Sequence, residues 1–334
     1  MLTTIVVFGC NSVLATDFVP PPSAREHGRI TLIEENDDLM PRPTDRWYTQ
    51  GVELSYLSAP IAAGGSEWLL PATASDAKAQ SRRFEILIGQ SIFTPENLNL
   101  SPPDPKDRPY AGWLYGGVGL YREDDHRSLE HLRLLLGIVG PGALAQQAQD
   151  GFHVLLREAP TPGWAFQLKD EPGLVFSYER KWRLDLLAGK GLRVDAIPEV
   201  GASLGNVFTY AEAGGLVRLG QNLKADYGPA RIQPALSGTP WFDPSQLEGP
   251  IGWYVFAGAQ VRATARNIFL DGNTFASSAS VEKRPLVTDF SVGLSVFWLD
   301  VAKVDFVVTS RSPEFVGQHA ADRFGGINVS FRLP

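Results

Sequence analysis

The sequence predicts an all-β protein, a single twelve-stranded antiparallel transmembrane β-barrel with a short helix in an extracellular loop. Three observations predict this fold: the number of alternating segments, their length, and the order of short and long connections. Segments in which polar and apolar residues alternate start near residues 29, 48, 82, 111, 130, 172, 191, 207, 252, 286, 301 and 324. Many run for roughly 9 to 14 residues, the length that a tilted strand needs to cross a bilayer.

The connections between these segments are of two kinds. Short hairpins are expected at 184–195 and 298–305, where turn residues separate two alternating runs. Long connections, rich in proline and glycine, are expected at 59–81, 92–109, 140–171 and 221–250. Short periplasmic turns and long outer loops are typical of outer-membrane barrels.

The overall composition narrows the class of protein. The 334 residues carry a formal net charge of −7 and the pI is about 5.3, so no nucleic-acid partner is expected. No apolar run reaches the roughly 18 residues of a spanning helix. A mean hydropathy of −0.08 fits both an outer-membrane barrel and a soluble β-sandwich, which is the alternative fold.

The start of the chain reads as an export signal. Residues 3–8 are apolar, and residues 13–15 form a cleavage site of small or branched residues, although no basic residue precedes Arg25. We expect a signal peptide at 1–15, a leader at 16–28 and an outer-membrane barrel domain at 29–334. A lipoprotein site at Cys10 is the alternative. Because Cys10 is the only cysteine, cleavage after residue 15 would leave neither a disulfide nor a thiolate metal site.

One segment, 143–156, breaks the strand pattern and predicts a short amphipathic helix within a long loop. Its apolar residues recur at helical spacing at Ala145, Ala148, Phe152 and Leu155. Another face carries Gln146, Gln149, Asp150 and His153. Gly151 weakens the helix by roughly 1 kcal/mol. We expect the apolar side to pack on the barrel wall.

Oxygen-bearing side chains gather where the first two predicted strands meet. The first ends in Glu35, Asn36, Asp37 and Asp38, and the second carries Thr49 and Glu53. Carboxylate, amide and hydroxyl oxygens suit Ca²⁺. The alternative interpretation of the acidic stretch is a plain polar turn.

Other hydrolytic chemistries find less support in the sequence. Ser55 and Ser91, on predicted strands, have no local partner pattern for a serine nucleophile, and no pair of histidines has the i, i+4 spacing of a helical zinc site. Of the five histidines, only His153 lies on the predicted helix with amide and acid neighbours on its face. Its alternative role is that of an ordinary packed or surface residue.

An ordered series of motifs, from about residue 29 to 333, resembles the lipid A 3′-O-deacylase family of outer-membrane proteins. The series comprises 35–38 (ENDD), 44–51 (TDRWYTQG), 89–95 (GQSIFTP), 107–115 (DRPYAGWLY), 137–141 (GIVGP), Gln149, His153, Gly163, Trp164, Gln167, Glu171, Pro172 and 312–318 (SPEFVGQ). Each motif alone is weak, whereas their order and spacing together are specific.

The resemblance implies a twelve-stranded barrel whose site lies where the outer end meets a loop helix. It also implies Ca²⁺-dependent hydrolysis of the ester-linked 3′ acyl chains of lipid A. By matching of motifs, the family's active residues fall on Asn36, Asp37, Thr49 and His153, with Asp38 beside them.

A mechanism follows from this resemblance as a hypothesis. His153 would take a proton from the water that attacks the ester carbonyl. Ca²⁺, held by Asp37 with Asn36 and Asp38, would polarise the carbonyl and stabilise the oxyanion. Asn36 or Thr49 would donate a further hydrogen bond or complete the metal shell.

Lipid A carries phosphates, so a basic cluster near the site is expected. Where members of the family carry a Lys-Arg pair, this chain has 96–100 (ENLNL). Lys106 and Arg108 are the expected substitutes, with Arg82 and Arg83 as alternatives. Arg108 is alternatively a structural partner of Asp107.

The expected partners are lipid A or lipopolysaccharide in the outer leaflet, with the protein a monomer in the bacterial outer membrane. Two other functions stay open at this point. One is hydrolysis of another acylated lipid, such as a phospholipid. The other is a non-catalytic barrel that acts as a pore or a structural protein.

Overall fold

The structure is a computed structural model that describes residues 27–40, 45–61, 80–156, 160–189, 191–235 and 238–334. The predicted signal peptide and nearly all of the predicted leader therefore lie outside the described residues. None of the helices in these ranges is long and apolar enough to cross a membrane.

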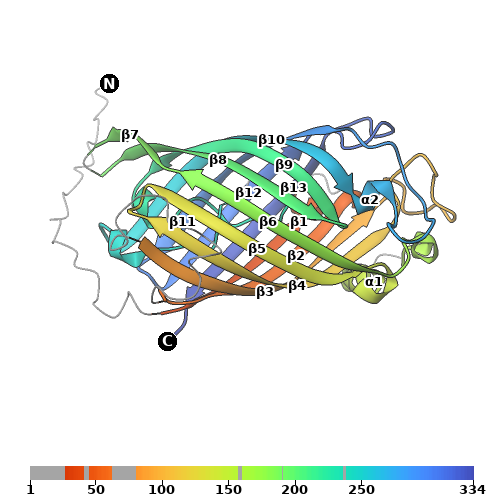
Figure 1. Cartoon of the computed structure of the whole chain (residues 1–334), viewed down its shortest axis with the longest axis horizontal. Coiled ribbons are helices and arrows are strands. Elements are labelled where there is room, and N and C mark those ends of the chain that lie inside the picture. Colours follow the sequence, from red (N-terminus) through yellow and green to blue (C-terminus); the bar gives the residue numbers. More distant parts are fainter. Residues whose placement is uncertain (1–26, 41–44, 62–79, 157–159, 190, 236–237) are drawn as a thin grey trace, which may run out of the picture.

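The described residues form one antiparallel sheet that closes into a barrel (Figure 1). Its strands are β1 (Arg29–Asn36), β2 (Trp47–Leu57), β3 (Gln80–Thr94), β4 (Ala111–Asp124), β5 (Ser128–Val139), β6 (Glu171–Trp182), β7 (Leu184–Ala188), β8 (Arg193–Gly205), β9 (Phe208–Gly220), β10 (Ile251–Asn267), β11 (Leu286–Trp298), β12 (Ala302–Arg311) and β13 (Asp322–Arg332). The helices are α1 (Ala145–Leu156) and α2 (Ile268–Asp271), with short 3-10 turns such as η2 (Asp37–Leu39).

Closure makes this sheet a twelve-stranded barrel. β1 pairs with β13, so the first and last strands meet, and β6 pairs with β8. β7 follows β6 after Arg183 and pairs with the start of β8, so the two segments act as one bent strand of the wall. The predicted fold is confirmed, and each predicted start lies within two residues of an observed strand start, as for 82 against Gln80.

The two faces of the wall show why a soluble sandwich is excluded. On β3, the outward-facing Ile86 and Ile88 are 53% and 55% exposed. Glu85, which faces inward on the same strand, is fully buried. Arg133 of β5 is also buried and pairs with Glu53 of β2 inside the lumen at 2.6 Å. Apolar side chains outside and charged side chains inside are the pattern that a lipid environment selects.

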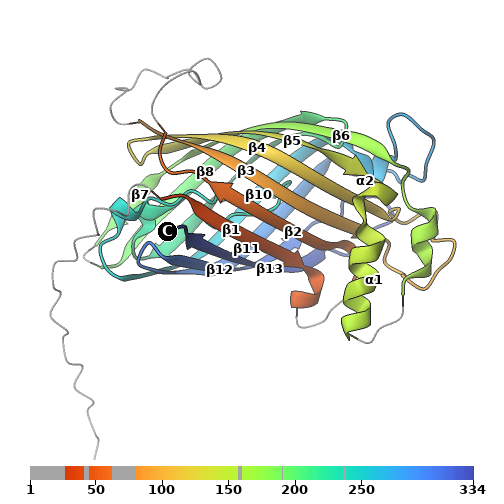
Figure 2. The same ribbon diagram turned by 90° about the horizontal axis from the view of Figure 1, so that it is seen from below.

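The connections gather at two ends of the barrel. We call the end that carries α1 the helix end, and the opposite end, where β1 starts and β13 stops, the terminal end (Figures 1 and 2). The strand directions place the connections that follow β1, β3 and β5 at the helix end and those that follow β2 and β9 at the terminal end. The sequence predicts that all long connections lie at one end of the barrel and short turns at the other. This prediction is wrong for the long connections that follow β2 and β9.

One of these two connections fills the lumen. The described residues of 226–242, here called the lumen segment, contact strands on several sides of the barrel. Asn328 of β13 donates to the carbonyl of Ala230 at 2.6 Å, and the Tyr227 hydroxyl donates to Glu123 of β4 at 2.9 Å. Contacts with strands so far apart around the wall require the segment to lie inside the barrel.

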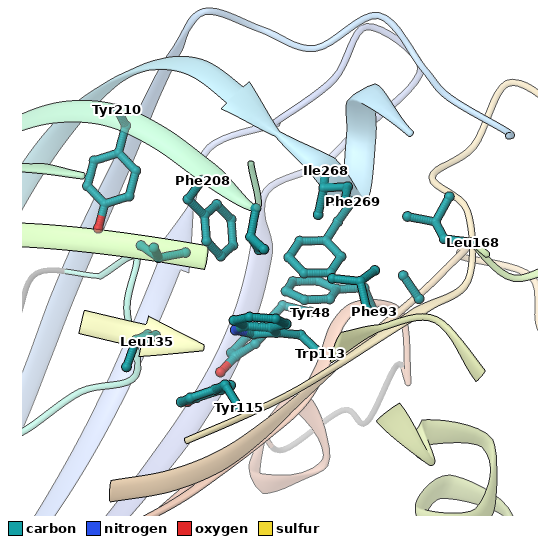
Figure 3. Packing of buried hydrophobic residues seen from close by; sticks show 14 of the residues in the cluster. Tyr48, Phe93, Trp113, Tyr115, Leu135, Leu168, Phe208, Tyr210, Ile268 and Phe269 are labelled. Atoms are coloured by element: carbon teal, nitrogen blue, oxygen red, sulfur yellow. The ribbon is translucent and has the colours of Figure 1, made fainter. Parts of the chain in front are cut away.

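Aromatic side chains fill the lumen near the helix end. Phe93 of β3 stacks on Phe269 of α2 with ring centroids 4.0 Å apart, and Tyr48 contacts Phe93 at 5.5 Å (Figure 3). Trp113 and Tyr115 of β4 belong to the same buried cluster. This packing gives the ends of β2, β3 and β4 a rigid inner support.

Candidate active site

Asn36 and Asp37 lie where β1 ends. Glu35 faces the lumen, so the alternation of the strand turns Asn36 to the outer side of the wall. The Asn36 side-chain oxygen accepts a hydrogen bond from the Asp38 amide at 2.7 Å and caps η2. Asp37 is only 1% exposed and accepts the Arg46 amide at 2.8 Å. The stretch is thus a polar turn in its local structure, but its central acid is buried.

Thr49 occupies a β-bulge. In the pairing of β2 with β3, Tyr48 opposes Phe93 and Gln50 opposes Ile92, which leaves Thr49 with no opposing residue. Its hydroxyl lies 2.7 Å from the hydroxyl of Thr94. A bulge re-aims a side chain without moving the rest of the strand, and such irregularities often occur next to active sites.

His153 lies on α1, within the helix predicted at 143–156. Ala145 and the partly buried Ala148 of the predicted apolar face pack with Trp164, but Gln149 and His153 of the predicted polar face are buried as well, so the docked side of the helix combines both. His153 is 6% exposed, and its Nε2 lies 2.8 Å from Oδ2 of Asp45. Gln149, one turn earlier, donates to the same carboxylate at 3.0 Å.

Asp45 joins the parts of the site and is the residue that sequence reasoning missed. Its carboxylate receives His153 and Gln149, and its carbonyl lies 3.4 Å from the hydroxyl of Thr94, the partner of Thr49. The next amide, of Arg46, donates to Asp37. Hydrogen bonds therefore link all four predicted active residues or their direct neighbours.

The backbone of Asp45 adopts the left-handed conformation, with φ +44°. Non-glycine residues adopt this region rarely, and they do so mainly in turns and at functional sites. The one signal for Asp45 in the sequence is that it is an acid within the motif at 44–51. The sequence does not reveal its contact with His153, because the two residues lie 108 positions apart.

The loop 95–110 covers the β1–β2 connection. Arg46 forms an ion pair with Glu96, and its guanidinium lies 4.2 Å from the ring centroid of Trp47. Asp107 accepts the amides of Glu96 and Arg108 at 2.6 and 2.7 Å. Burial raises the pKa of Asp107 above its usual value, and these two amide hydrogen bonds oppose the shift.

The expected phosphate contacts are only partly supported. Arg108 is fully buried, donates to Glu314 at 3.2 Å and lies over Phe93, so it supports the loops and is not placed to reach a ligand. Lys106 is exposed on the same loop, and its role stays a prediction. Arg82 and Arg83 lie near the start of β3 at the terminal end, too far along the strand to contact the site.

The donor set suits a hard cation in its chemistry. Asn36, Asp37, Asp38 and Thr49 offer only oxygen ligands, the kind that Ca²⁺ takes. The described ranges contain no group of three or more acidic, histidine or cysteine side chains gathered closely enough to hold a metal ion. Since Ca²⁺ takes 6–8 oxygens, these residues would supply part of a shell that backbone, water or substrate oxygens complete.

A groove runs along the outer wall beside α1. Its volume is about 600 Å³, and Gly89 and Gly151 are among the residues that line it. The other lining residues are Gln50, Val52, Leu54, Ile88, Gln90, Leu114, Ala148 and Phe152. Leu54 and Ile88 belong to the exposed apolar surface of the barrel. The helix that carries His153 therefore borders a cavity on the lipid-facing side of the wall.

Comparisons with known proteins agree with this architecture. A family model described as outer membrane protein LpxR matches residues 2–333. The solved structure of LpxR from Salmonella typhimurium is 21% identical, with a TM-score of 0.74, and the match covers 91% of this chain and 99% of that one.

The β domain of the Bordetella autotransporter BrkA is 9% identical, with a TM-score of 0.44, over 92% of this chain and 98% of that one. A search of curated proteins gives no match. The family match spans nearly the whole chain. The chain therefore belongs to the LpxR family of outer-membrane proteins and is an outer-membrane enzyme of the kind that modifies lipid A.

Proposed function

We propose that the protein hydrolyses the ester-linked 3′ acyl or acyloxyacyl chains of lipid A in the outer leaflet. The observation that carries this proposal is the position of the His153–Asp45 pair, because His153 lies on a helix that borders an apolar groove in the outer wall. A lipid can enter such a groove directly from the membrane. Its ester would then lie at the level where the strands end and the polar residues begin.

His153 is the proposed base. An ionised Asp45 can only accept a hydrogen bond, so the Nε2 that faces it carries the hydrogen, and Nδ1 keeps the lone pair. Nδ1 takes a proton from the water that attacks the ester carbonyl, and the protonated ring then returns it to the departing alcohol oxygen. Asp45 holds the ring orientation and stabilises its positive charge.

Asn36, Asp37 and Asp38 are the proposed Ca²⁺ ligands. When bound, Ca²⁺ would polarise the ester carbonyl and stabilise the charge that develops on its oxygen. The Asn36 side-chain oxygen accepts a hydrogen bond from the Asp38 amide, so the NH₂ group of Asn36 donates to other acceptors. Asn36 and Thr49 supply hydrogen bonds to the carbonyl oxygen or complete the metal shell.

The filled lumen speaks against the alternative of a pore. Buried ion pairs and aromatic clusters occupy the interior, and the lumen segment crosses it. A water-filled channel needs a wider, open interior. Hydrolysis of a phospholipid remains a second candidate, because the groove accepts any acyl chain and Glu96 occupies the position of an expected basic residue.

The test is mass spectrometry of lipid A from a Gram-negative host that lacks such an enzyme. Expression of the wild-type protein should remove the mass of one acyl or acyloxyacyl group. His153→Gln should leave lipid A intact while the barrel stays folded, as measured by circular dichroism. Retained activity in His153→Gln would remove this residue from the base role. Intact lipid A together with released phospholipid fatty acids would favour the second substrate.

A further inference from the structure

The tip of the lumen segment reaches the back of the candidate active site. Arg231 is 4% exposed and forms an ion pair with Glu35, the residue before Asn36. The Ile232 amide donates to the same carboxylate at 3.3 Å. Two strands away from β1 along the wall, the Thr309 hydroxyl of β12 accepts a hydrogen bond from Arg231 at 2.8 Å. Arg231 thus braces the end of β1 against β12.

Glu35 transmits this contact to β2. Its second oxygen accepts the Tyr48 hydroxyl at 2.9 Å, and Tyr48 is the residue before the bulge at Thr49. A side chain at position 51 would collide with the Tyr48 ring and with Ile232. Because Gly51 has none, Tyr48 and Ile232 can lie directly against β2. One buried carboxylate therefore fixes the strand ends that carry Asn36 and Thr49 on their other side.

We propose that Arg231 is a positioning residue, which acts from the lumen through Glu35 and Tyr48 to hold Asn36 and Thr49 in their catalytic geometry. The proposal rests on the proposed function for its effect on rate. Asn36 and Glu35 are adjacent on one strand, so a rotation of one turns the other. A misplacement of about 1 Å at a reacting centre can lower the rate about 100-fold.

The main variant is Arg231→Met, with Arg183→Met as the matched control. Arg183 is also a buried arginine that holds the lumen segment, through the carbonyl of Asp226, but it does so at the terminal end. We expect Arg231→Met to lower kcat for lipid A deacylation about 100-fold, with KM changed less than about twofold. Arg231→Lys should restore part of the loss, and Arg183→Met should lower the thermal midpoint but not kcat.

A second variant covers the case in which Arg231→Met does not fold. Tyr48→Phe removes one hydroxyl and keeps the ring packing, and it should lower kcat about tenfold, the effect of losing about 1.4 kcal/mol. An unchanged kcat in either folded variant would overturn the proposal. An equal loss of kcat in Arg183→Met would also overturn it, because a general loosening of the lumen would then explain the effect.

Hydrogen–deuterium exchange separates this proposal from the proposed function. Arg231→Met should speed exchange at residues 36–40 and 46–50, and Arg183→Met should not. This readout does not depend on activity. A wild-type protein that leaves lipid A intact would refute the deacylase function, while the exchange result would still decide whether Arg231 positions these strand ends. Unchanged exchange in Arg231→Met would overturn the positioning role.

Discussion

At the scale of single residues, the site depends on a short chain of hydrogen bonds. Asp45 receives His153 and Gln149, and Gln149 in turn accepts the Trp164 indole at 2.7 Å. A carboxylate that binds one ring nitrogen fixes which nitrogen of a histidine is the base. The geometry therefore gives Asp45 a defined task, although it comes from a loop and not from a strand or helix.

Asp45→Asn should lower kcat by between about 100-fold and 10,000-fold, because an amide no longer fixes the ring or stabilises its charge. The measurement is the rate of deacylation of purified lipid A at saturating substrate. Asp104→Asn is the control, since Asp104 is an exposed acid whose side chain accepts the Lys106 amide. Equal rates in Asp45→Asn and wild type would show that His153 does not depend on this partner.

Removal of divalent cations should stop the reaction, and added Ca²⁺ should restore it, because the oxygen ligands at β1 suit that cation. Asp37→Asn should need at least about tenfold more Ca²⁺ for half-maximal rate, since one ligand loses its charge. Asparagine keeps an oxygen for the Arg46 amide, so the local turn should persist. A rate that chelation leaves unchanged would refute the metal in this mechanism.

At the scale of elements, α1 serves two purposes. One face docks on the loops through Ala145 and carries His153, and another borders the groove through Ala148, Gly151 and Phe152. Gly151 is costly within a helix, yet a side chain there would meet no atom within 4 Å. The open space is the groove itself, so the missing side chain keeps it wide.

Gly151→Phe should block the groove, and Gly151→Ala should not. The alanine variant should keep its activity and stabilise the helix by about 1 kcal/mol. The phenylalanine variant should lose kcat/KM for long acyl chains and keep it for a short soluble ester. The measurement is kcat/KM as a function of acyl-chain length for both variants. Full cleavage of long chains by Gly151→Phe would place the acyl chain elsewhere.

At the scale of the whole molecule, the barrel encloses a packed interior that supports the site. Its inner surface is charged, but the charges pair with each other and with the lumen segment. Arg218 of β9, for example, binds Asp195 at 2.9 Å and also the carboxylate of Asp226. Buried charges that are paired and hydrogen-bonded leave little space for a water-filled pathway.

The purified protein should therefore give no steady ion conductance in planar bilayers. A variant in which a short Gly-Ser linker replaces residues 228–240 should conduct, provided that circular dichroism shows a folded barrel, because the lumen then opens. Steady conductance of the wild-type protein, comparable to that of an open porin, would contradict this expectation and favour the alternative function of a pore.

The strands were predictable because their signal is local. Each wall residue faces either lipid or lumen, so β10 and β11 alternate between buried and more exposed side chains at almost every position. The bent pair of β6 and β7 and the path of residues 221–250 were not predictable in this way. The latter connection is polar and rich in turn residues, and nothing in its local pattern distinguishes an outer loop from a segment inside the lumen.

By itself, the sequence determined the closed barrel, the loop helix and the family, and it singled out Asn36, Asp37, Thr49 and His153. These follow from periodicity and from motifs that are contiguous along the chain. Only the tertiary structure decided that Asp45 is the partner of His153, that Arg108 is buried, and that Arg231 braces Glu35. Such pairs join residues about a hundred or more positions apart. Their contact depends on the register and closure of the whole sheet, which no local pattern encodes.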